Sequence, residues 1–364
     1  ISRYIKILHE GGFIKSDFYK PGEKALWYNI SPEYKEGFRE VELLQGTRLH
    51  DKIIKQQRRT KAHDNRLESF LKQMKAKFFG LEFDYDEAYK WIITNASPEK
   101  QPYYLTSINA IQDKRFRYFK RNGTNNRLDS NLTNLKSELR QFFKGDLVSI
   151  DLKNSQPFLL SILINQILAT TTLNNPLCCH FSDLNISKAF GIRTIKRIQI
   201  IHQKFKNMDL VNLKQFADST ANGMLYDDFC SVYPGDLNRE EVKQVMFNVL
   251  FSRNEQTARS EPTNPIDNEK AIFHSVYPFI YEATKILKAK DHTKLAITLQ
   301  KMESQLYIDI ISKELVDQII TPLTIHDSII IERNDLDQAN KTISSMFQQH
   351  CGIVPTFHIK DLKS

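Results

Sequence analysis

Residues 323–332 read LTIHDSIIIE, an apolar run that is interrupted near its centre by Asp327. A second short apolar run, LVSI at 147–150, ends directly before Asp151. A carboxylate on an apolar strand is costly to bury unless a cation or a polar partner satisfies it. A single aspartate in such a position is ordinarily a helix cap, but two of them, taken with the helix described next, favour another explanation. The two strands can pair and bring both carboxylates to one place, which predicts a site for Mg²⁺.

The segment 239–251 predicts a helix with a distinctive face. Arg239, Lys243, Phe247 and Phe251 recur every four residues, so they lie along one side of that helix. Two cations followed by two aromatic rings form a surface that suits a triphosphate at one end and a base at the other. By periodicity alone, the simpler explanation is an amphipathic helix whose aromatic rings belong to the core.

The positive charge of the chain is concentrated in its first part. The 364 residues include 51 Lys and Arg against 43 Asp and Glu, and the basic excess lies within residues 1–150. The segment 114–127, KRFRYFKRNGTNNR, holds six basic residues, no acidic residue and three interleaved aromatic rings. Its alternation and Asn-Gly pair predict a hairpin, and its side chains suit a sugar-phosphate backbone. The alternative is an amphipathic hairpin with a solvated cationic face.

The N-terminal residues 1–30 predict a helix, a turn and two strands. This order resembles the back half of a winged-helix DNA-binding domain, whose front helices would precede Ile1, although any helix followed by a hairpin gives the same pattern. No apolar run is long enough to span a membrane, and no signal peptide is present. Four cysteines are too few for a disulfide framework in a chain of this length, which favours a reducing compartment. We therefore expect a cytoplasmic protein.

Three motifs occur along the chain in the order that is typical of a known protein family. Asp151, then Arg239-x3-Lys243-x3-Phe247-x3-Phe251, then His326-Asp327 resembles motifs A, B and C of the family A DNA polymerases and the related single-subunit phage RNA polymerases. The segment 124–142, TNNRLDSNLTNLKSELRQF, is similar to the stretch that precedes motif A in that family, with Asn126 in place of a glycine. The resemblance covers about residues 120–340.

The resemblance implies a role for each matching residue. It implies two Mg²⁺ ions, with Mn²⁺ as a substitute, held by the catalytic carboxylates Asp151 and Asp327 and by the Leu152 carbonyl. It implies catalytic contacts of Arg239 and Lys243 with the incoming triphosphate, and places Phe247 and Phe251 beside the sugar and base. Its nucleic-acid contacts would be Arg127, Arg140, His326 and Gln305, with Gln300 competing for the place of Gln305; the charge pattern adds Lys114, Arg115, Arg117, Lys120 and Arg121.

Several positions depart from the family pattern. Motif C reads His326-Asp327-Ser328, as in the phage RNA polymerases, where DNA polymerases of the family usually have His-Asp-Glu. Gln156 stands where the family has its ribose-excluding glutamate, and a bulky glutamine can still block a 2′-hydroxyl. Phe251 replaces a tyrosine near the sugar. Together these departures favour deoxynucleotides, with an RNA polymerase or primase of the same superfamily as the alternative.

The resemblance implies an α+β right-hand fold with an antiparallel palm. We expect five parts: a partial winged helix at 1–45, a basic thumb-like helical region at 46–120, a first palm part at 121–165, fingers at 166–262 and a second palm part at 263–364. The expected function is a DNA-directed DNA polymerase of a phage, plasmid or other mobile element. Its partners would be a DNA primer-template, nucleoside triphosphates and element-encoded replication proteins, and no membrane.

Two other classes of protein share parts of this pattern. A non-enzymatic winged-helix replication initiator would use the second half of the chain as a dimer scaffold, but a scaffold has no use for two carboxylates on apolar strands. A two-metal nuclease explains the aspartates but neither Arg239 and Lys243 nor the aromatic pair. A primer-extension assay with Mg²⁺ separates the three classes by extension, degradation or binding alone.

Overall fold

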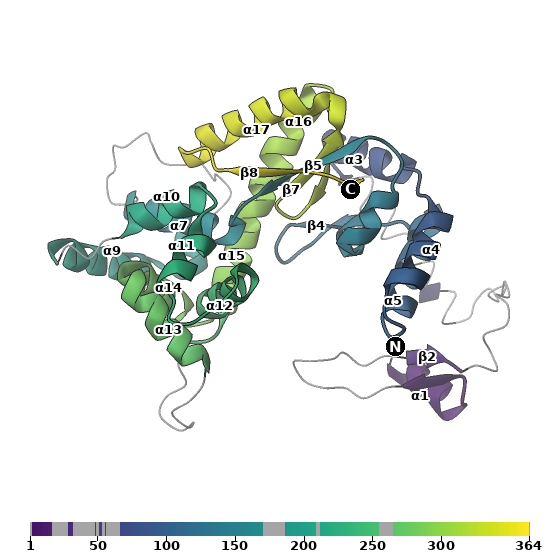
Figure 1. Cartoon of the computed structure of the whole chain (residues 1–364), viewed down its shortest axis with the longest axis horizontal. Helices are drawn as coiled ribbons and strands as arrows, with labels where there is room; N and C mark the ends of the chain where they lie inside the picture. The colour runs from purple at the N-terminus through teal and green to yellow at the C-terminus, as the bar shows by residue number, and fades with distance from the viewer. Residues whose placement is uncertain are drawn as a thin grey trace. The chain divides into compact units, whose positions relative to one another are not determined.

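The computed structural model describes residues 2–16, 28–31, 48, 51, 52, 55, 66–169, 186–208, 212–254 and 265–363 (Figure 1). The chain divides into two compact units, Ile1–Leu67 and Glu68–Ser364. Much of the predicted thumb-like region before residue 66 lies outside the described residues, as does the turn predicted after Ser16. The finer division into five parts stays a prediction.

The first unit begins with the predicted helix and strands. Helix α1 (Ser2–Glu10) ends at Gly11 and Gly12, and the φ of 75° at Gly12 is one that glycine adopts without strain. Strands β1 (Ile14–Ser16) and β2 (Tyr28–Ile30) then pair antiparallel. The predicted order of helix and strands is confirmed, and the winged-helix assignment stays a prediction.

A four-stranded sheet lies at the centre of the second unit. Its order is β6 (Leu323–Ile325), β7 (Ser328–Glu332), β5 (Leu147–Leu152) and β8 (Phe357–Asp361), with every neighbouring pair antiparallel. The two segments that carry the aspartates pair as predicted, with Asp151 opposite Ser328. His326 and Asp327 form the turn between β6 and β7, and His326 takes a positive φ of 54°, as two-residue hairpin turns require.

The two faces of this sheet differ in polarity. Along β5, Val148, Ile150 and Leu152 are buried, while Ser149 and Asp151 point to the other face and are partly exposed. The apolar face belongs to a core that includes α7 (Ser155–Ala169) and α17 (Leu336–Cys351), where the rings of Phe158 and Phe347 meet at 6.0 Å. Figure 1 shows α17 running alongside the sheet. Alternation along β5 therefore directs Asp151 away from this core.

Helices make up most of the chain between the strands. None of the helices that the structure describes is both long and apolar enough to cross a membrane. The coarse prediction of a mixed fold with helices and small antiparallel sheets is confirmed. The remaining helices after α7 are α8 (Ile186–Phe190), α9 (Ile192–Asn207), α10 (Leu213–Ala221), α11 (Leu225–Val232), α12 (Arg239–Phe251), α13 (Pro265–Val276), α14 (Pro278–Lys288) and α15 (Thr293–Ser304), which continues through a π-helical segment (Gln305–Ser312) into α16 (Lys313–Asp317).

Helix α12 is held at both of its ends. Asn238 caps its first turn and forms a reciprocal capping box with Glu241. At the other end, the buried ammonium of Lys288 donates to the carbonyls of Val249 at 2.8 Å and Ser252 at 3.0 Å. Because both sets of terminal backbone groups have partners, α12 presents its exposed face from a fixed position.

The segment before the sheet contains the predicted basic hairpin. It comprises α3 (Ser69–Gly80), α4 (Tyr85–Asn95), α5 (Gln101–Gln112), the strands β3 (Phe119–Arg121) and β4 (Leu128–Ser130), and α6 (Asn131–Asn134). The two strands pair antiparallel, so the hairpin prediction is confirmed, with a longer loop than a two-residue Asn-Gly turn. Short 3₁₀ turns at Lys114–Phe116 and Ser137–Phe142 flank it.

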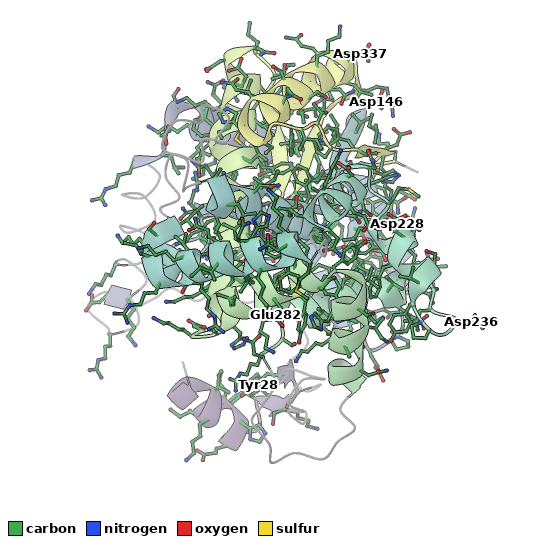
Figure 2. The ribbon with its side chains drawn as sticks, turned by 90° about the vertical axis from the view of Figure 1, so that its left-hand side faces the viewer. Tyr28, Asp146, Asp228, Asp236, Glu282 and Asp337 are labelled. Carbon is green, nitrogen blue, oxygen red and sulfur yellow. The ribbon has the colours of Figure 1, made fainter. Side chains whose placement is uncertain are left out.

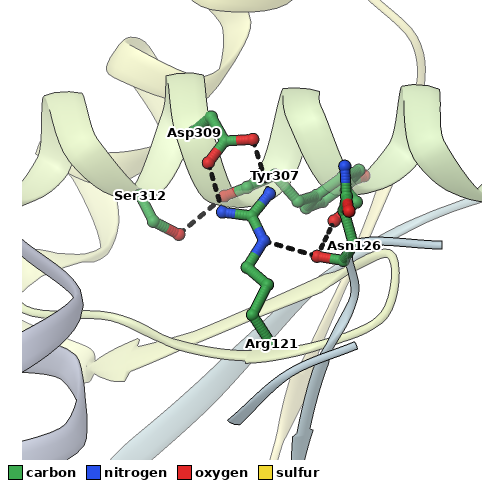
Figure 3. A network of polar contacts seen from close by, with 6 residues as sticks. Arg121, Asn126, Tyr307, Asp309 and Ser312 are labelled. Carbon is green, nitrogen blue, oxygen red and sulfur yellow. Dashed lines mark hydrogen bonds and ion pairs between the residues drawn. The ribbon is translucent and has the colours of Figure 1, made fainter. Parts of the chain in front are cut away.

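This hairpin is docked on the long helix formed by α15 and the π-helical segment. The guanidinium of Arg121 pairs with Asp309 at 2.5 Å and donates to the Asn126 carbonyl at 2.7 Å (Figure 3). Ser304 donates to the same carbonyl, and Asn125 donates to Gln300 at 3.1 Å. Polar contacts therefore fix the hairpin loop against one side of this helix.

Arg117 does not belong to the cationic surface that the sequence predicted. It is 6% exposed, and its guanidinium donates to the carbonyls of Ile111, Phe78, Phe79 and Leu81 at 2.8–3.2 Å. A side chain that is committed to four backbone carbonyls cannot also bind a phosphate. The nucleic-acid role predicted for Arg117 is wrong, and the residue instead joins α3 to α5.

We predict that Arg117→Met destabilises the protein by roughly 2–4 kcal/mol, because several buried carbonyls lose their donor. Arg115→Met is the matched control, since Arg115 is in the same segment with a side chain that is 78% exposed. We expect a change of less than about 0.5 kcal/mol for the control. Urea unfolding of both variants measures the difference, and equal midpoints would contradict the structural role of Arg117.

Candidate active site

One cavity of about 520 Å³ gathers the two aspartates and most of the residues predicted to contact the metal or the nucleotide. Its walls come from residues 151–156, which span the end of β5 and the start of α7, from Asp327 in the β6–β7 turn, and from Arg239, Lys243 and Phe247 on α12. Met224 and Tyr226, at the start of α11, and His358 of β8 also line the cavity. Residues far apart in the sequence therefore meet around a single space.

The two aspartates interact electrostatically within this cavity. The backbone N–H of Leu152 donates to the Asp327 carbonyl at 3.2 Å, which ties the end of β5 to the β6–β7 turn. Burial and the neighbouring charge of Asp327 raise the pKa of Asp151 to about 7, although Lys243 and Arg140 act in the opposite direction. Burial also raises the pKa of Asp327. The protein's own cations therefore leave this carboxylate pair incompletely compensated.

This donor set fits a hard divalent cation. Among the residues that the structure describes, no cluster of three or more His, Cys, Asp and Glu side chains forms a closed metal site. The available protein ligands are the two carboxylates, with Leu152 at the same wall. Mg²⁺ typically binds through one or two carboxylates and takes water and phosphate oxygens for its other positions. An open site with two carboxylates matches that preference.

The carboxylate partners of the two α12 cations are exposed. Arg239 lies 3.5 Å from the Asp227 carboxylate and its guanidinium stands 5.4 Å over the Tyr226 ring, while Lys243 lies 3.8 Å from Glu240. The side chains of Arg239 and Lys243 are 44% and 45% exposed. Ion pairs at this exposure are weak, so both cations can exchange their carboxylate partners for an anion that enters the cavity.

The two aromatic residues of α12 differ in position. Phe247 is 36% exposed and lines the cavity one turn beyond Lys243. Phe251 does not line it; its ring packs against the core and lies 5.6 Å from the ring of Phe247. The structure therefore brings Phe247, but not Phe251, to the cavity wall.

A buried carboxylate that the sequence analysis missed lies behind this wall. Glu303 of α15 pairs with Arg127 at 2.7 Å and accepts a hydrogen bond from the Gln156 side chain at 2.5 Å. Burial, with the nearby charge of Asp327, raises the pKa of Glu303 to about 8. Gln305, which the resemblance favoured on this helix, is buried, and Gln300 is bound to Asn125. Glu303 therefore contacts the cavity wall through Gln156, although it does not itself line the cavity.

Several buried polar groups around the cavity lack a partner. Both amide atoms of Asn154 and the Tyr307 hydroxyl find no hydrogen-bond partner among the residues that the structure describes. The same holds for the Nε atoms of Arg127 and Arg140. Asn154 also has a strained positive φ of 56°. Unpaired buried polar atoms are costly in a protein interior, and their concentration here is typical of a binding site.

The remaining predicted nucleic-acid contacts have diverse surroundings. Lys114 and Lys120 are exposed, and Arg115 is exposed but paired with Asp113 at 2.8 Å. Arg121 and Arg127 are engaged by the carboxylates described above. His326 is exposed in the turn beside Asp327, and partial desolvation of its ring lowers its pKa. By contrast, acidic residues such as Asp236 and Asp337 lie at the periphery (Figure 2).

Comparisons with known proteins give little further guidance. No protein-family model matches the chain, and no curated protein matches it. One solved structure that resembles it is the POL domain of Pol1 from M. smegmatis, in complex with DNA primer-template and dNTP. The match has a TM-score of 0.43 and 10% sequence identity, and it covers 77% of this chain and 55% of that chain. The chain thus spans about half of that structure, and a likeness of this strength assigns neither family nor function.

The raised pKa of Asp151 predicts how the metal-free protein responds to pH. Its folded pKa of about 7 exceeds the ordinary value of 3.8, so the unfolded state releases this proton at lower pH than the folded state. The group's contribution to the free energy of unfolding therefore falls as the pH rises from about 4 to about 7. We expect Asp151→Asn to be more stable than the wild type in EDTA, by a margin that grows over this pH range and is constant above it.

Thermal unfolding at several pH values in EDTA measures this margin, with Asp236→Asn as an exposed control that should show none. Added Mg²⁺ should stabilise the wild type at pH 8 and close the gap to Asp151→Asn, because the cation offsets the carboxylate charge. A less stable Asp151→Asn at pH 8 would rule out the electrostatic account.

Proposed function

We propose that the protein is a template-directed nucleotidyltransferase, a DNA-dependent DNA polymerase that adds dNTPs to a primer. The observation that carries this proposal is the meeting of Asp151 and Asp327 with Arg239, Lys243 and Phe247 around one cavity. Carboxylates suit metal ions, guanidinium and ammonium groups suit a polyphosphate, and an exposed ring suits a base or sugar. A nucleoside triphosphate is a ligand that uses all three kinds of group.

Each wall of the cavity has a task in this proposal. Asp151 and Asp327, with the Leu152 carbonyl, would hold two Mg²⁺ ions, which would supply electrostatic stabilisation for a phosphoryl transfer. Arg239 and Lys243 bind the triphosphate and stabilise the negative charge that develops on the transferred phosphate. Phe247 packs against the nucleotide one helical turn from Lys243, with Phe251 supporting its ring from behind.

Features of the site favour a polymerase over its rivals. A nuclease needs the carboxylates but has no use for two cations and an aromatic ring on one helix face. A scaffold for an initiator needs neither. Ser328, the residue after Asp327, does not add a third carboxylate to the site; its hydroxyl lies 2.5 Å from that of Ser149.

The choice between DNA and RNA synthesis rests on Gln156 at the cavity wall, and an RNA polymerase or primase is the second candidate.

The biological setting is part of the same proposal. A polymerase core with a DNA-binding N-terminal unit suits the replication of a phage, plasmid or other mobile element, together with element-encoded replication proteins. In this proposal, the sheet of the second unit is the palm of a right-hand fold, and the helices around α12 are its fingers.

The catalytic assignment predicts that Asp151→Ala and Asp327→Ala each reduce nucleotide incorporation at least about a thousandfold while DNA binding persists, because electrostatic stabilisation of the transition state is lost. Primer extension with Mg²⁺ and dNTPs measures this, and Asp236→Ala is the matched control. Degradation of the primer by the wild type would indicate a nuclease, and binding without turnover would indicate an initiator. Retention of a tenth of the activity by either variant would remove the metal assignment.

The nucleic-acid surface predicts a strong dependence of DNA affinity on salt. Lys114, Arg115 and Lys120 are exposed, and each cation that contacts a phosphate displaces counterions. Replacing all three with Gln should flatten the slope of log K against log salt concentration by about two to three units. Lys341→Gln on α17 serves as the control for a general loss of charge. An unchanged slope in the triple variant would place the nucleic acid on another surface.

A further inference from the structure

Three segments that are distant in the sequence meet at the carboxylate of Glu303. The side chain is 1% exposed, and its Oε2 accepts one charge-assisted hydrogen bond, at 2.9 Å, from Arg127 in the loop between β3 and β4. The Glu303 carboxylate also accepts a hydrogen bond from the side-chain amide nitrogen of Gln156, in the first turn of α7, at 2.5 Å. A buried carboxylate needs such partners, because an unpaired charge in a protein interior is strongly destabilising.

This arrangement fixes a residue of the cavity wall from behind. Gln156 lines the cavity, whereas Glu303 does not. With its amide nitrogen committed to Glu303, the Gln156 side chain keeps one orientation at the wall. Arg127 has an 18% exposed side chain and completes the set from the hairpin. Glu303 therefore controls the shape of a wall that it does not itself form.

The position of Gln156 in the cavity indicates which part of a nucleotide it faces. Arg239 and Lys243 mark the end of the cavity that suits phosphates, and Phe247 lies one turn further along α12. In a nucleotide, the sugar lies between the phosphates and the base. Gln156 comes from the segment that follows Asp151, so it lines the cavity from a different element than α12, and in the proposed function this is the wall that faces the sugar.

We propose that Glu303 is a positioning residue for sugar discrimination, which acts through Gln156 and is held in place by Arg127. This inference rests on the proposed polymerase function. The carboxylate supplies the negative charge that Arg127 requires, and its Oε2 accepts from both the guanidinium and the Gln156 amide. A neutral amide at 303 would leave Arg127 without its counter-charge and would weaken the hydrogen bond that orients Gln156.

The test compares incorporation of one dNTP and the matching rNTP by wild type, Glu303→Gln, Gln156→Ala and the double variant. We expect Glu303→Gln to reduce the ratio of the two kcat/KM values by at least about fivefold, within the range of coupling energies measured for contacting residues. Gln156→Ala leaves the Glu303–Arg127 pair intact, so it should fold, and it should reduce the ratio similarly. The double variant should show no further loss, because both changes act through the same side chain.

A reciprocal exchange provides a sharper readout. Gln156→Glu alone places two carboxylates in contact, whereas the combined change of Gln156→Glu and Glu303→Gln restores one carboxylate and one amide beside Arg127. We expect the combined variant to recover discrimination that each single change loses. Asp309→Asn is the matched control, since it breaks another ion pair between the hairpin and this helix and should alter stability but not the sugar ratio.

The outcomes separate the inference from the proposed function. Absence of primer extension by the wild type with either nucleotide would overturn the polymerase proposal itself. Extension by the wild type with an unchanged ratio in Glu303→Gln, or strictly additive losses in the double variant, would overturn the role of Glu303 alone. If Asp309→Asn changed the ratio of the dNTP and rNTP kcat/KM values as much as Glu303→Gln does, the inference would likewise fail. The docking of the hairpin, and not the Gln156 contact, would then set that ratio.

Discussion

The electrostatic repulsion between the carboxylate of Asp151 on β5 and that of Asp327 in the adjoining β6–β7 turn is the constraint on which this site depends. Antiparallel pairing of β5 and β7 fixes Asp151 beside Ser328, one residue from Asp327, in a partly desolvated place. The surrounding groups moderate this repulsion without cancelling it: Lys243 and Arg140 favour the charged form of Asp151, and Arg127 favours that of Asp327. The free energy stored in this arrangement is available to a cation and its anionic ligand.

Because the carboxylates are fixed by the sheet, the opposite wall must be fixed as well if the cavity is to have a defined width. Helix α12 meets this need through its capped ends. The buried Lys288 contributes at the C-terminal end, and burial with the nearby Lys270 lowers its pKa to about 8. Lys270 itself donates to the Arg253 carbonyl just beyond the helix. Two cations at a helix C-terminus also interact favourably with its dipole, which stabilises the end farthest from Arg239.

The parts of the site that the sequence predicted share one property: each lies within a short, periodic segment. The two aspartates interrupt apolar strands, and the four-residue spacing from Arg239 to Phe247 appears within one helix. Glu303 was missed because its role arises from partners 147 and 176 residues away in the chain, and its own helix shows only ordinary amphipathic spacing. Arg117 was misassigned for a related reason, since composition cannot distinguish a guanidinium on the surface from one that caps buried carbonyls of another helix.

The π-helical segment between α15 and α16 has a consequence for changes in chain length. Each residue of an α-helix adds about 100° of rotation, and a π-helical stretch absorbs additional residues by widening its turns. Glu303 lies before this segment and Asp309 within it, and both face the same hairpin. Deleting one residue between them would rotate one carboxylate away from its arginine, so the two ion pairs with the hairpin fix the length of this helix.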